Sequence, residues 1–201
     1  MERIGLLGGT FNPIHNGHLR LAELMKNELG LDRVVFIPDH IPPHKSEEGV
    51  LPDETRLEML RLAIEDIPYA ETDSREIDRG GKSYTFYTLK ELTEENPKAK
   101  YFFLVGSDMF LSLDRWFKSE EIMKMAHFCG VARTPEDKEA LLLKQKEFKE
   151  KGFETVVLDE EAIVLSSSEI RERITLGEDV SSLMPHSVWA FIKEKGLYGN
   201  N

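Results

Sequence analysis

Short apolar runs alternate with amphipathic segments along this 201-residue chain. The apolar runs are typical of strands buried on both faces of a parallel sheet, and they cover residues 3–7, 33–37, 101–105, 127–132 and 155–158. Between them, apolar residues recur at helical spacing, which predicts helices at about 17–29, 56–67, 84–94, 119–125, 136–151, 167–175 and 185–195. Strands that alternate with helices predict an α/β fold, a doubly wound, Rossmann-like parallel sheet with helices on both faces.

The length predicts one domain over residues 1–201, with a small helical region from about residue 165 to residue 201. In a doubly wound sheet, ligands bind beyond the carboxyl ends of the strands, where the strand order reverses. We therefore expect a binding site beside the loop that leaves the first strand.

Glycines, a proline and two histidines fill the segment between the first strand and the first helix, residues 8–18 (GGTFNPIHNGH). Gly8 and Gly9 have no Cβ, and we expect them to let the backbone turn sharply and approach a bulky ligand. His15 and His18 lie where the helix starts, and the free N–H groups and positive dipole end of a helix N-terminus favour an anion. The segment is therefore predicted to bind phosphate.

Other nucleotide-binding loops do not fit this segment. A P-loop would end in Gly-Lys-Ser or Gly-Lys-Thr, and the glycine spacing differs from the G-x-G-x-x-G fingerprint. Two histidines three residues apart are also compatible with zinc, although no cysteine is nearby and the closest carboxylates, Glu2 and Glu23, lie outside the segment. Zinc binding and a purely structural role for both imidazoles stay open as alternatives.

A second motif lies near the C-terminus, at residues 165–171 (LSSSEIR). The two motifs resemble the H-x-G-H and I-S-S-T-x-I-R signatures of a nucleotidyltransferase superfamily. Within it the chain resembles bacterial nicotinate mononucleotide adenylyltransferases, through residues 38–45 (PDHIPPHK), 83–85 (SYT) and a Gly-x-Asp at 106–108 that is followed by Leu113 and Trp116. The sequence departs from the family pattern at Asn12, where the family usually has Asp, and at Ser168, where it has Thr.

The resemblance implies an enzyme that transfers the adenylyl group of ATP to nicotinate mononucleotide, giving nicotinate adenine dinucleotide and pyrophosphate in NAD biosynthesis. The implied mechanism is direct in-line attack of the substrate phosphate, which requires positioning and charge stabilisation rather than a protein nucleophile. The alternatives are an enzyme that takes nicotinamide mononucleotide or both mononucleotides, and a nucleotide-sensing module without catalysis.

The resemblance also implies roles for individual residues. The implied catalytic residues are His15, His18, Lys45 and Arg171. The implied ATP-binding residues are Gly8, Gly9, Thr10, Phe11, Gly17, Gly106, Asp108, Arg133, Ser167 and Ser168. The implied nicotinate mononucleotide-binding residues are His44, Lys45, Tyr84, Thr85 and Trp116. By residue type alone, Ser167 and Ser168 are also expected to cap the following helix, and Trp116 suits either a core or a pyridinium ring.

Composition narrows the choice of partners. Lys and Arg total 26 against 37 Asp and Glu, and the formal net charge of −11 disfavours nucleic acid. The single cysteine, Cys129, excludes a disulfide within the chain. No apolar stretch has the length of a signal peptide or a membrane span, so we expect a cytoplasmic protein without a membrane partner. We also expect Mg²⁺ to accompany ATP without dedicated protein ligands, and a homodimer as the default assembly.

Overall fold

The computed structural model describes residues 1–42, 48–132, 134–158 and 165–199. Within these residues the strands form a six-stranded sheet in the order β3-β2-β1-β4-β5-β6, and all neighbouring strands are parallel. The strands are β1 (Arg3–Gly9), β2 (Arg33–Pro38), β3 (Ala70–Thr72), β4 (Lys100–Gly106), β5 (His127–Val131) and β6 (Thr155–Leu158).

Helices follow most of the strands. The α-helices are α1 (Asn16–Glu28), α2 (Asp53–Ile64), α3 (Arg75–Arg79), α4 (Thr85–Glu95), α5 (Ser107–Leu111), α6 (Ser119–Met125), α7 (Pro135–Glu150), α8 (Ser167–Thr175) and α9 (His186–Lys195). Two short 3-10 helices are η1 (Leu113–Arg115) and η2 (Ser181–Leu183). In the described part of the chain, every helix is too short or too polar to span a bilayer.

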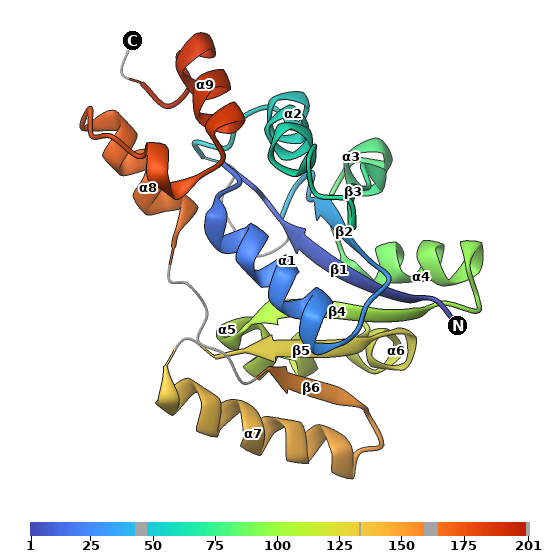
Figure 1. Cartoon of the computed structure of the whole chain (residues 1–201). Coiled ribbons are helices and arrows are strands. Elements are labelled where there is room, and N and C mark those ends of the chain that lie inside the picture. Colours follow the sequence, from blue (N-terminus) through green and yellow to red (C-terminus); the bar gives the residue numbers. More distant parts are fainter. Residues whose placement is uncertain (43–47, 133, 159–164, 200–201) are drawn as a thin grey trace.

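Helices cover both faces of the sheet, and each face has its own apolar core (Figure 1). Successive side chains of a strand point to opposite faces, so neighbouring residues of β1 enter different cores. Leu7 belongs to the core that includes residues of α1, α2, α8 and α9, whereas Leu6 belongs to the core that includes residues of α4, α5, α6 and α7. The prediction of a doubly wound, Rossmann-like sheet is confirmed.

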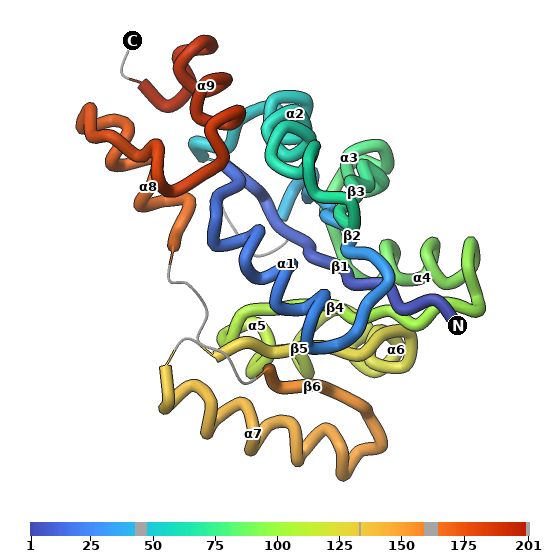
Figure 2. Tube along the Cα trace, in the orientation of Figure 1, coloured from blue at the N-terminus to red at the C-terminus, as the bar shows by residue number. Residues whose placement is uncertain are grey.

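The strand order reverses between β1 and β4, which lie side by side at the centre of the sheet. The crevice of such a sheet lies at the carboxyl ends of these two strands. Figure 2 shows α8 and α9 at that end of β1, near the start of α1 and far from the N-terminus. Ser187 Oγ fixes α9 to α2 by donating a 3.0 Å hydrogen bond to the carbonyl of Leu62. The last helices of the chain thus lie where the ligand is expected.

The apolar runs and helical periods locate most of the elements, although several ends shift. Helix α2 begins at Asp53 and ends at Ile64 rather than covering 56–67. The elements that the pattern does not predict are β3, α3, α5 and both 3-10 helices, each of five residues or fewer. Segments this short do not complete an apolar period that a sequence could display. The single domain over residues 1–201 stays a prediction.

Candidate active site

The loop after β1 turns at Phe11, not at the two glycines expected to make the turn. β1 stays paired with β2 through Gly9, and neither Gly8 nor Gly9 has a positive φ, whereas Phe11 has φ +48°. The expectation of a sharp turn at the glycines is therefore wrong. They serve packing instead, because a Cβ would lie 3.2 Å from the ring of Phe103 at Gly8 and 3.2 Å from the ring of Phe11 at Gly9.

His15 and His18 stack on each other at the start of α1. His15 is the N-cap residue, and the centroids of the two rings are 3.8 Å apart with an interplanar angle of 26°. The backbone N–H of His15 donates a 3.3 Å hydrogen bond to Nδ1 of His18. Since Nδ1 accepts, a neutral His18 ring carries its proton on Nε2. Phe11 contacts the His18 ring edge-on, with centroids 5.0 Å apart, so packing also fixes this imidazole.

The His15 ring is the buried member of this stacked pair, with 4% of the residue exposed. Burial lowers the pKa of its imidazole to about 4, so the ring is neutral at pH 7. Its Nδ1 makes no well-formed hydrogen bond with any described residue. A Cβ on Gly17 would lie 3.0 Å from that nitrogen and 3.3 Å from Leu165 of the second motif. Glycine at position 17 therefore lets the imidazole and the second motif approach each other.

The second motif packs directly on the first. Ser167 Oγ donates a 2.9 Å hydrogen bond to the carbonyl of Pro13, 154 residues earlier in the chain. Arg171 Nη1 donates a 2.8 Å hydrogen bond to the carbonyl of Asn12. The two motifs therefore form one surface beyond the carboxyl end of β1.

The helix cap of the second motif is Ser166 rather than the predicted Ser167 and Ser168. Ser166 has an extended backbone (φ −118°, ψ 129°), and its Oγ accepts a 3.2 Å hydrogen bond from the N–H of Ser168. The expectation is wrong because α8 already begins at Ser167. This leaves the two later hydroxyls in the first turn, where that of Ser168 accepts a 3.2 Å hydrogen bond from Arg171 Nη2.

The guanidinium of Arg171 is held by neutral acceptors, the carbonyl of Asn12 and the hydroxyl of Ser168. Among the residues that the structure describes, no carboxylate forms an ion pair with it. A positive charge that is fixed in place without a counter-ion, in the first turns of a helix, suits a bound anion. The site therefore has the charge that a polyphosphate requires.

Arg56 supports the loop from below, and the sequence reasoning missed it. Its side chain is fully buried (0% exposed) and donates hydrogen bonds to the carbonyls of Thr10 (2.7 Å) and Asp39 (2.6 Å). It also pairs with the carboxylates of Asp39 and Asp53, and Thr10 Oγ1 donates to Asp39 at 2.9 Å. Helix α2 thereby holds the first residue of the loop against the end of β2. The one sequence signal that could have revealed Arg56 is its position on the buried face of a helix.

Gly106 and Asp108 lie at the end of β4, the strand next to β1. Gly106 is the last residue of β4, and Asp108 lies in the first turn of α5; both are exposed. Neighbouring parallel strands end at the same edge of a sheet, so both residues lie at the same edge as the loop after β1.

Tyr84, Thr85 and Trp116 come from two segments that the structure brings together. Tyr84 is the N-cap residue of α4 and Thr85 its first residue. The ring of Tyr84 lies 5.0 Å from that of Phe117, which follows Trp116. Trp116 is only partly buried, with its ring edge-on to Phe128 at a centroid distance of 6.0 Å. One part of the indole therefore packs on the core while another part remains accessible.

Hydrogen bonds through Ser83, directly before Tyr84, tie the start of α4 to the end of β2. The N–H of His40 donates to Ser83 Oγ, and the N–H of Ser83 donates to the carbonyl of Ile41, both at 2.9 Å. The start of α4, which carries Thr85, is therefore held at the same end of the sheet as the loop after β1.

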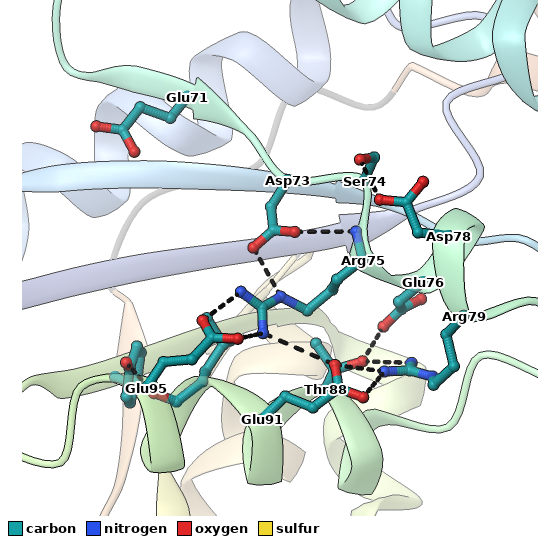
Figure 3. Close-up of polar contacts among 12 residues, drawn as sticks. Glu71, Asp73, Ser74, Arg75, Glu76, Asp78, Arg79, Thr88, Glu91 and Glu95 are labelled. Carbon is teal, nitrogen blue, oxygen red and sulfur yellow. Dashed lines mark hydrogen bonds and ion pairs between the residues drawn. The ribbon is translucent and has the colours of Figure 1, made fainter.

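A charged network braces α3 against α4 (Figure 3). Glu76 is buried and accepts a hydrogen bond from Thr88 Oγ1, and burial raises the pKa of its carboxyl. Arg79 donates to the same hydroxyl at 3.0 Å and to Glu91 at 2.8 Å. These contacts fix α4 along its first turns, and they are structural because each charged group is satisfied within the network.

A cavity near the starts of β1 and β4 is lined by charged residues that already have partners. Arg75 pairs there with Asp73 and Glu95, as Figure 3 shows, and Arg33 pairs with Glu71. Ligands of doubly wound sheets bind at the carboxyl ends of the strands where the order reverses, here β1 and β4, whereas this cavity lies near the starts of these two strands and beside the edge strand β3. We therefore do not assign it to the site.

Three of the predicted site residues, His44, Lys45 and Arg133, lie outside the described residues. The roles of the other site residues stay predictions, although the structure brings them to one end of the sheet. In the described ranges, no group of three or more His, Cys, Asp or Glu side chains is arranged to hold a metal ion. Cys129 is buried in β5, and burial raises the pKa of its thiol.

The chain matches known proteins over nearly its whole length. The model of the cytidylyltransferase-like family matches residues 6–173, from β1 through the second motif. A Listeria welshimeri protein described as "probable nicotinate-nucleotide adenylyltransferase" is 40% identical over 198 residues, 98% of each chain. A Lactiplantibacillus plantarum protein of the same description is 39% identical over 200 residues, which cover 100% of this chain and 90% of the relative.

Solved structures agree on the fold. The Plasmodium falciparum nicotinic acid mononucleotide adenylyltransferase, solved in complex with NaAD, has a TM-score of 0.77 with this chain at 19% identity and covers 98% of both chains. The resemblance seen in the sequence motifs is confirmed by the full-length relatives. The chain belongs to the cytidylyltransferase-like family and, within it, to the nicotinate-nucleotide adenylyltransferases.

Proposed function

We propose that the protein transfers the adenylyl group of ATP to nicotinate mononucleotide, giving nicotinate adenine dinucleotide and pyrophosphate for NAD biosynthesis. The observation that carries the proposal is the direct contact between the two motifs, through Ser167 on Pro13 and Arg171 on Asn12. This contact supports a single site for a triphosphate. Relatives that match over almost their full length bear the name of the same activity.

The triphosphate of ATP lies between the N-termini of α1 and α8. Both helix ends offer free N–H groups and a positive dipole end to the phosphates. Arg171 and the hydroxyls of Ser167 and Ser168 bind the β- and γ-phosphates, and His18 donates from Nε2 toward the α-phosphate. The neutral His15 ring supports His18 from below. Gly8, Gly9, Thr10, Phe11 and Gly17 form the backbone wall of this pocket.

Adenylyl transfer then proceeds by in-line displacement. A phosphate oxygen of nicotinate mononucleotide attacks the α-phosphorus of ATP; the new phosphorus–oxygen bond forms as the bond to the bridging oxygen of pyrophosphate breaks. The attacking phosphate is ionised at neutral pH, so no protein base has to remove a proton. The protein positions both substrates and stabilises the charge that moves onto the leaving pyrophosphate.

The two ends of the substrates define the rest of the site. Lys45 and His44 bind the phosphate of nicotinate mononucleotide. Gly106, Asp108 and Arg133 contact the adenosine, with Asp108 accepting hydrogen bonds from ribose hydroxyls.

The pyridine ring lies beside the start of α4. Trp116 offers an aromatic face to the positively charged ring. Helix α4 has no side-chain cap at Tyr84 and no acidic residue in its first turn, so its N–H groups at Thr85 favour a carboxylate over an amide. This arrangement favours nicotinate over nicotinamide mononucleotide.

Mg²⁺ accompanies ATP in this proposal, bound by phosphate oxygens and water, and lowers the net charge of the triphosphate. The described residues hold no group suited to bind a metal ion by themselves, which is compatible with a metal brought by the substrate. The cytoplasmic location and the homodimer expected from the sequence stay predictions.

The test is an assay of the purified protein with ATP, Mg²⁺ and one of the two mononucleotides, following pyrophosphate release and identifying the dinucleotide by mass spectrometry. We expect rapid release with nicotinate mononucleotide and much slower release with the amide. A preference for the amide would overturn the substrate assignment. ATP binding without pyrophosphate release in either mixture would instead favour a nucleotide sensor.

A further inference from the structure

Asn12 is a buried junction between segments that lie far apart in the chain. It is 3% exposed, and each polar atom of its side chain has a partner. Nδ2 donates a 2.9 Å hydrogen bond to the carbonyl of Gly49, while Oδ1 accepts from the hydroxyl of Tyr198 at 2.7 Å and from the N–H of Leu51 at 3.4 Å. The side chain thus joins the proposed phosphate loop, residues 10–15, to the segment before α2 and to the segment after α9.

The backbone of the same residue orients the second motif, because the carbonyl of Asn12 accepts the hydrogen bond from Arg171 Nη1. Tyr198 reinforces this arrangement: its own carbonyl accepts a 3.1 Å hydrogen bond from Thr175 Oγ1, at the end of α8. Tyr198 is therefore fixed both to the first motif and to the helix that carries Arg171. A shift of Asn12 moves the acceptor on which the guanidinium depends.

An amide suits this junction better than the carboxylate that the family pattern has at this position. A carboxylate could accept from Tyr198 and Leu51, but it has no proton to donate to the carbonyl of Gly49. Burial raises the pKa of Tyr198, so its hydroxyl keeps the proton that it donates to Oδ1. Donors and acceptors at the junction are matched when residue 12 is Asn.

We propose that Asn12 and Tyr198 are positioning residues for ATP: their hydrogen bond holds the phosphate loop so that the carbonyl of Asn12 presents Arg171 to the triphosphate. This inference rests on the proposed function, because it assigns the triphosphate to Arg171. The hydroxyl of Tyr198 contacts Asn12 and touches neither α1, α8 nor the substrate. The inference predicts that removing this hydroxyl weakens the binding of ATP and leaves the binding of nicotinate mononucleotide largely unchanged.

The test compares Tyr198→Phe with a matched control, Tyr101→Phe. The hydroxyl of Tyr101 also donates a 2.7 Å hydrogen bond, to the carbonyl of Leu92, at the opposite end of the sheet. We expect Tyr198→Phe to raise the KM for ATP about two- to tenfold, the effect of one ordinary hydrogen bond. Its KM for nicotinate mononucleotide should change by less than about twofold, and Tyr101→Phe should lower Tm without changing either KM.

A double-mutant cycle separates positioning from general stability. In an Asn12→Ala background the hydroxyl has lost its acceptor, so adding Tyr198→Phe should change the KM for ATP by less than about twofold. In an Asn12→Asp background, where two acceptors remain, Tyr198→Phe should still raise it. The cycle reports coupling only from variants that fold, so Tm is measured for each; Tyr198→Phe alone decides the matter if Asn12→Ala does not fold.

Two results would overturn the inference. One is a Tyr198→Phe variant that loses as much stability as Tyr101→Phe but keeps the wild-type KM for ATP. The other is an effect of Tyr198→Phe that persists undiminished with Asn12→Ala. If the wild-type protein binds ATP and makes no dinucleotide, the proposed reaction fails by itself, and ATP dissociation constants from titration calorimetry decide the inference with the same variants.

Discussion

The β3 edge of the sheet and the carboxyl end of β1 hold their arginines in opposite ways. Beside β3, Arg75 pairs with Asp73 and Glu95, so its charge is cancelled within the protein. At the carboxyl end of β1, Arg171 is held by a carbonyl and a hydroxyl, and no carboxylate among the described residues pairs with it. In a chain with a net charge of −11, a fixed guanidinium without such a partner favours an anion at this end of the sheet.

Burial differs between these two regions as well. The carboxyl end of β1 buries polar groups beneath the site, namely Asn12, His15 and Arg56, and satisfies most of them with backbone carbonyls and carboxylates. At the β3 edge, the carboxylate partners of the arginines remain partly exposed to solvent. The comparison therefore predicts large effects of substitution at the carboxyl end of β1 and small effects at the β3 edge.

The largest effect on stability is expected for Arg56→Met. It leaves the carboxylates of Asp39 and Asp53 without their buried partner, which typically costs about 3–5 kcal/mol. Urea unfolding measures the loss. A loss below about 1 kcal/mol would show that the buried guanidinium does not support the loop.

His18→Ala is expected to have the largest effect on catalysis. Removing one preorganised donor typically lowers turnover about a hundred- to thousandfold. The turnover number with saturating ATP and nicotinate mononucleotide measures it, and His186→Ala, which removes an exposed imidazole from α9, is the control with unchanged turnover. Equal turnover of the His18 variant and the wild type would remove His18 from the mechanism.

Arg171→Lys keeps the charge but loses the planar fork that contacts Asn12 and Ser168 together. We expect kcat/KM for ATP to fall about ten- to a hundredfold, as for charge-assisted hydrogen bonds. The control is Arg173→Lys, two residues further on, where the guanidinium pairs with Glu178 at the surface. If kcat/KM for ATP falls equally in both variants, Arg171 has no role in binding the phosphates that Arg173 lacks.

The pKa of His15 predicts a pH dependence of stability. Its folded pKa of about 4 lies below the ordinary value of 6.5, so at low pH the unfolded chain binds the proton more readily than the folded protein. The contribution of the neutral His15 ring to the free energy of unfolding is fully present above pH 6.5 and is lost as the pH falls toward 4. We expect the wild type to lose about 2 kcal/mol more than His15→Gln between about pH 7 and about pH 5 in urea unfolding. Parallel losses in the two proteins would contradict the burial of a neutral imidazole.

The smallest effect is expected for Arg75→Met. Its partners are partly exposed, and such ion pairs typically contribute about 0–1 kcal/mol. Unfolding should show a loss of that size, with kcat and both KM values unchanged. A loss of activity would remove the contrast between the β3 edge and the carboxyl end of β1.

The sequence predicted what depends on local pattern. Apolar runs located β1, β2, β4, β5 and β6, and the H-x-G-H segment located the loop between β1 and α1, because a strand, two histidines and a helix start follow each other directly in the chain. The second motif was recognisable for the same reason. Neither its contact with the first motif nor its exact helix start at Ser167 follows from local pattern.

The sequence could not show what depends on distant contacts. The turn at Phe11 is possible because its ring packs beneath His18, and Arg56 is buried because it meets the carbonyl of Thr10, 46 residues earlier. Tyr198 meets Asn12 across 186 residues. Each of these features is decided by tertiary structure rather than by the propensity of the residue.

The most direct test of the account is a crystal structure of the protein with a non-hydrolysable ATP analogue. The account predicts phosphate oxygens within hydrogen-bonding distance of both His18 and Arg171, at the carboxyl end of β1. A triphosphate that contacts one motif alone, or that lies in the cavity beside Arg75 at the β3 edge, would contradict it.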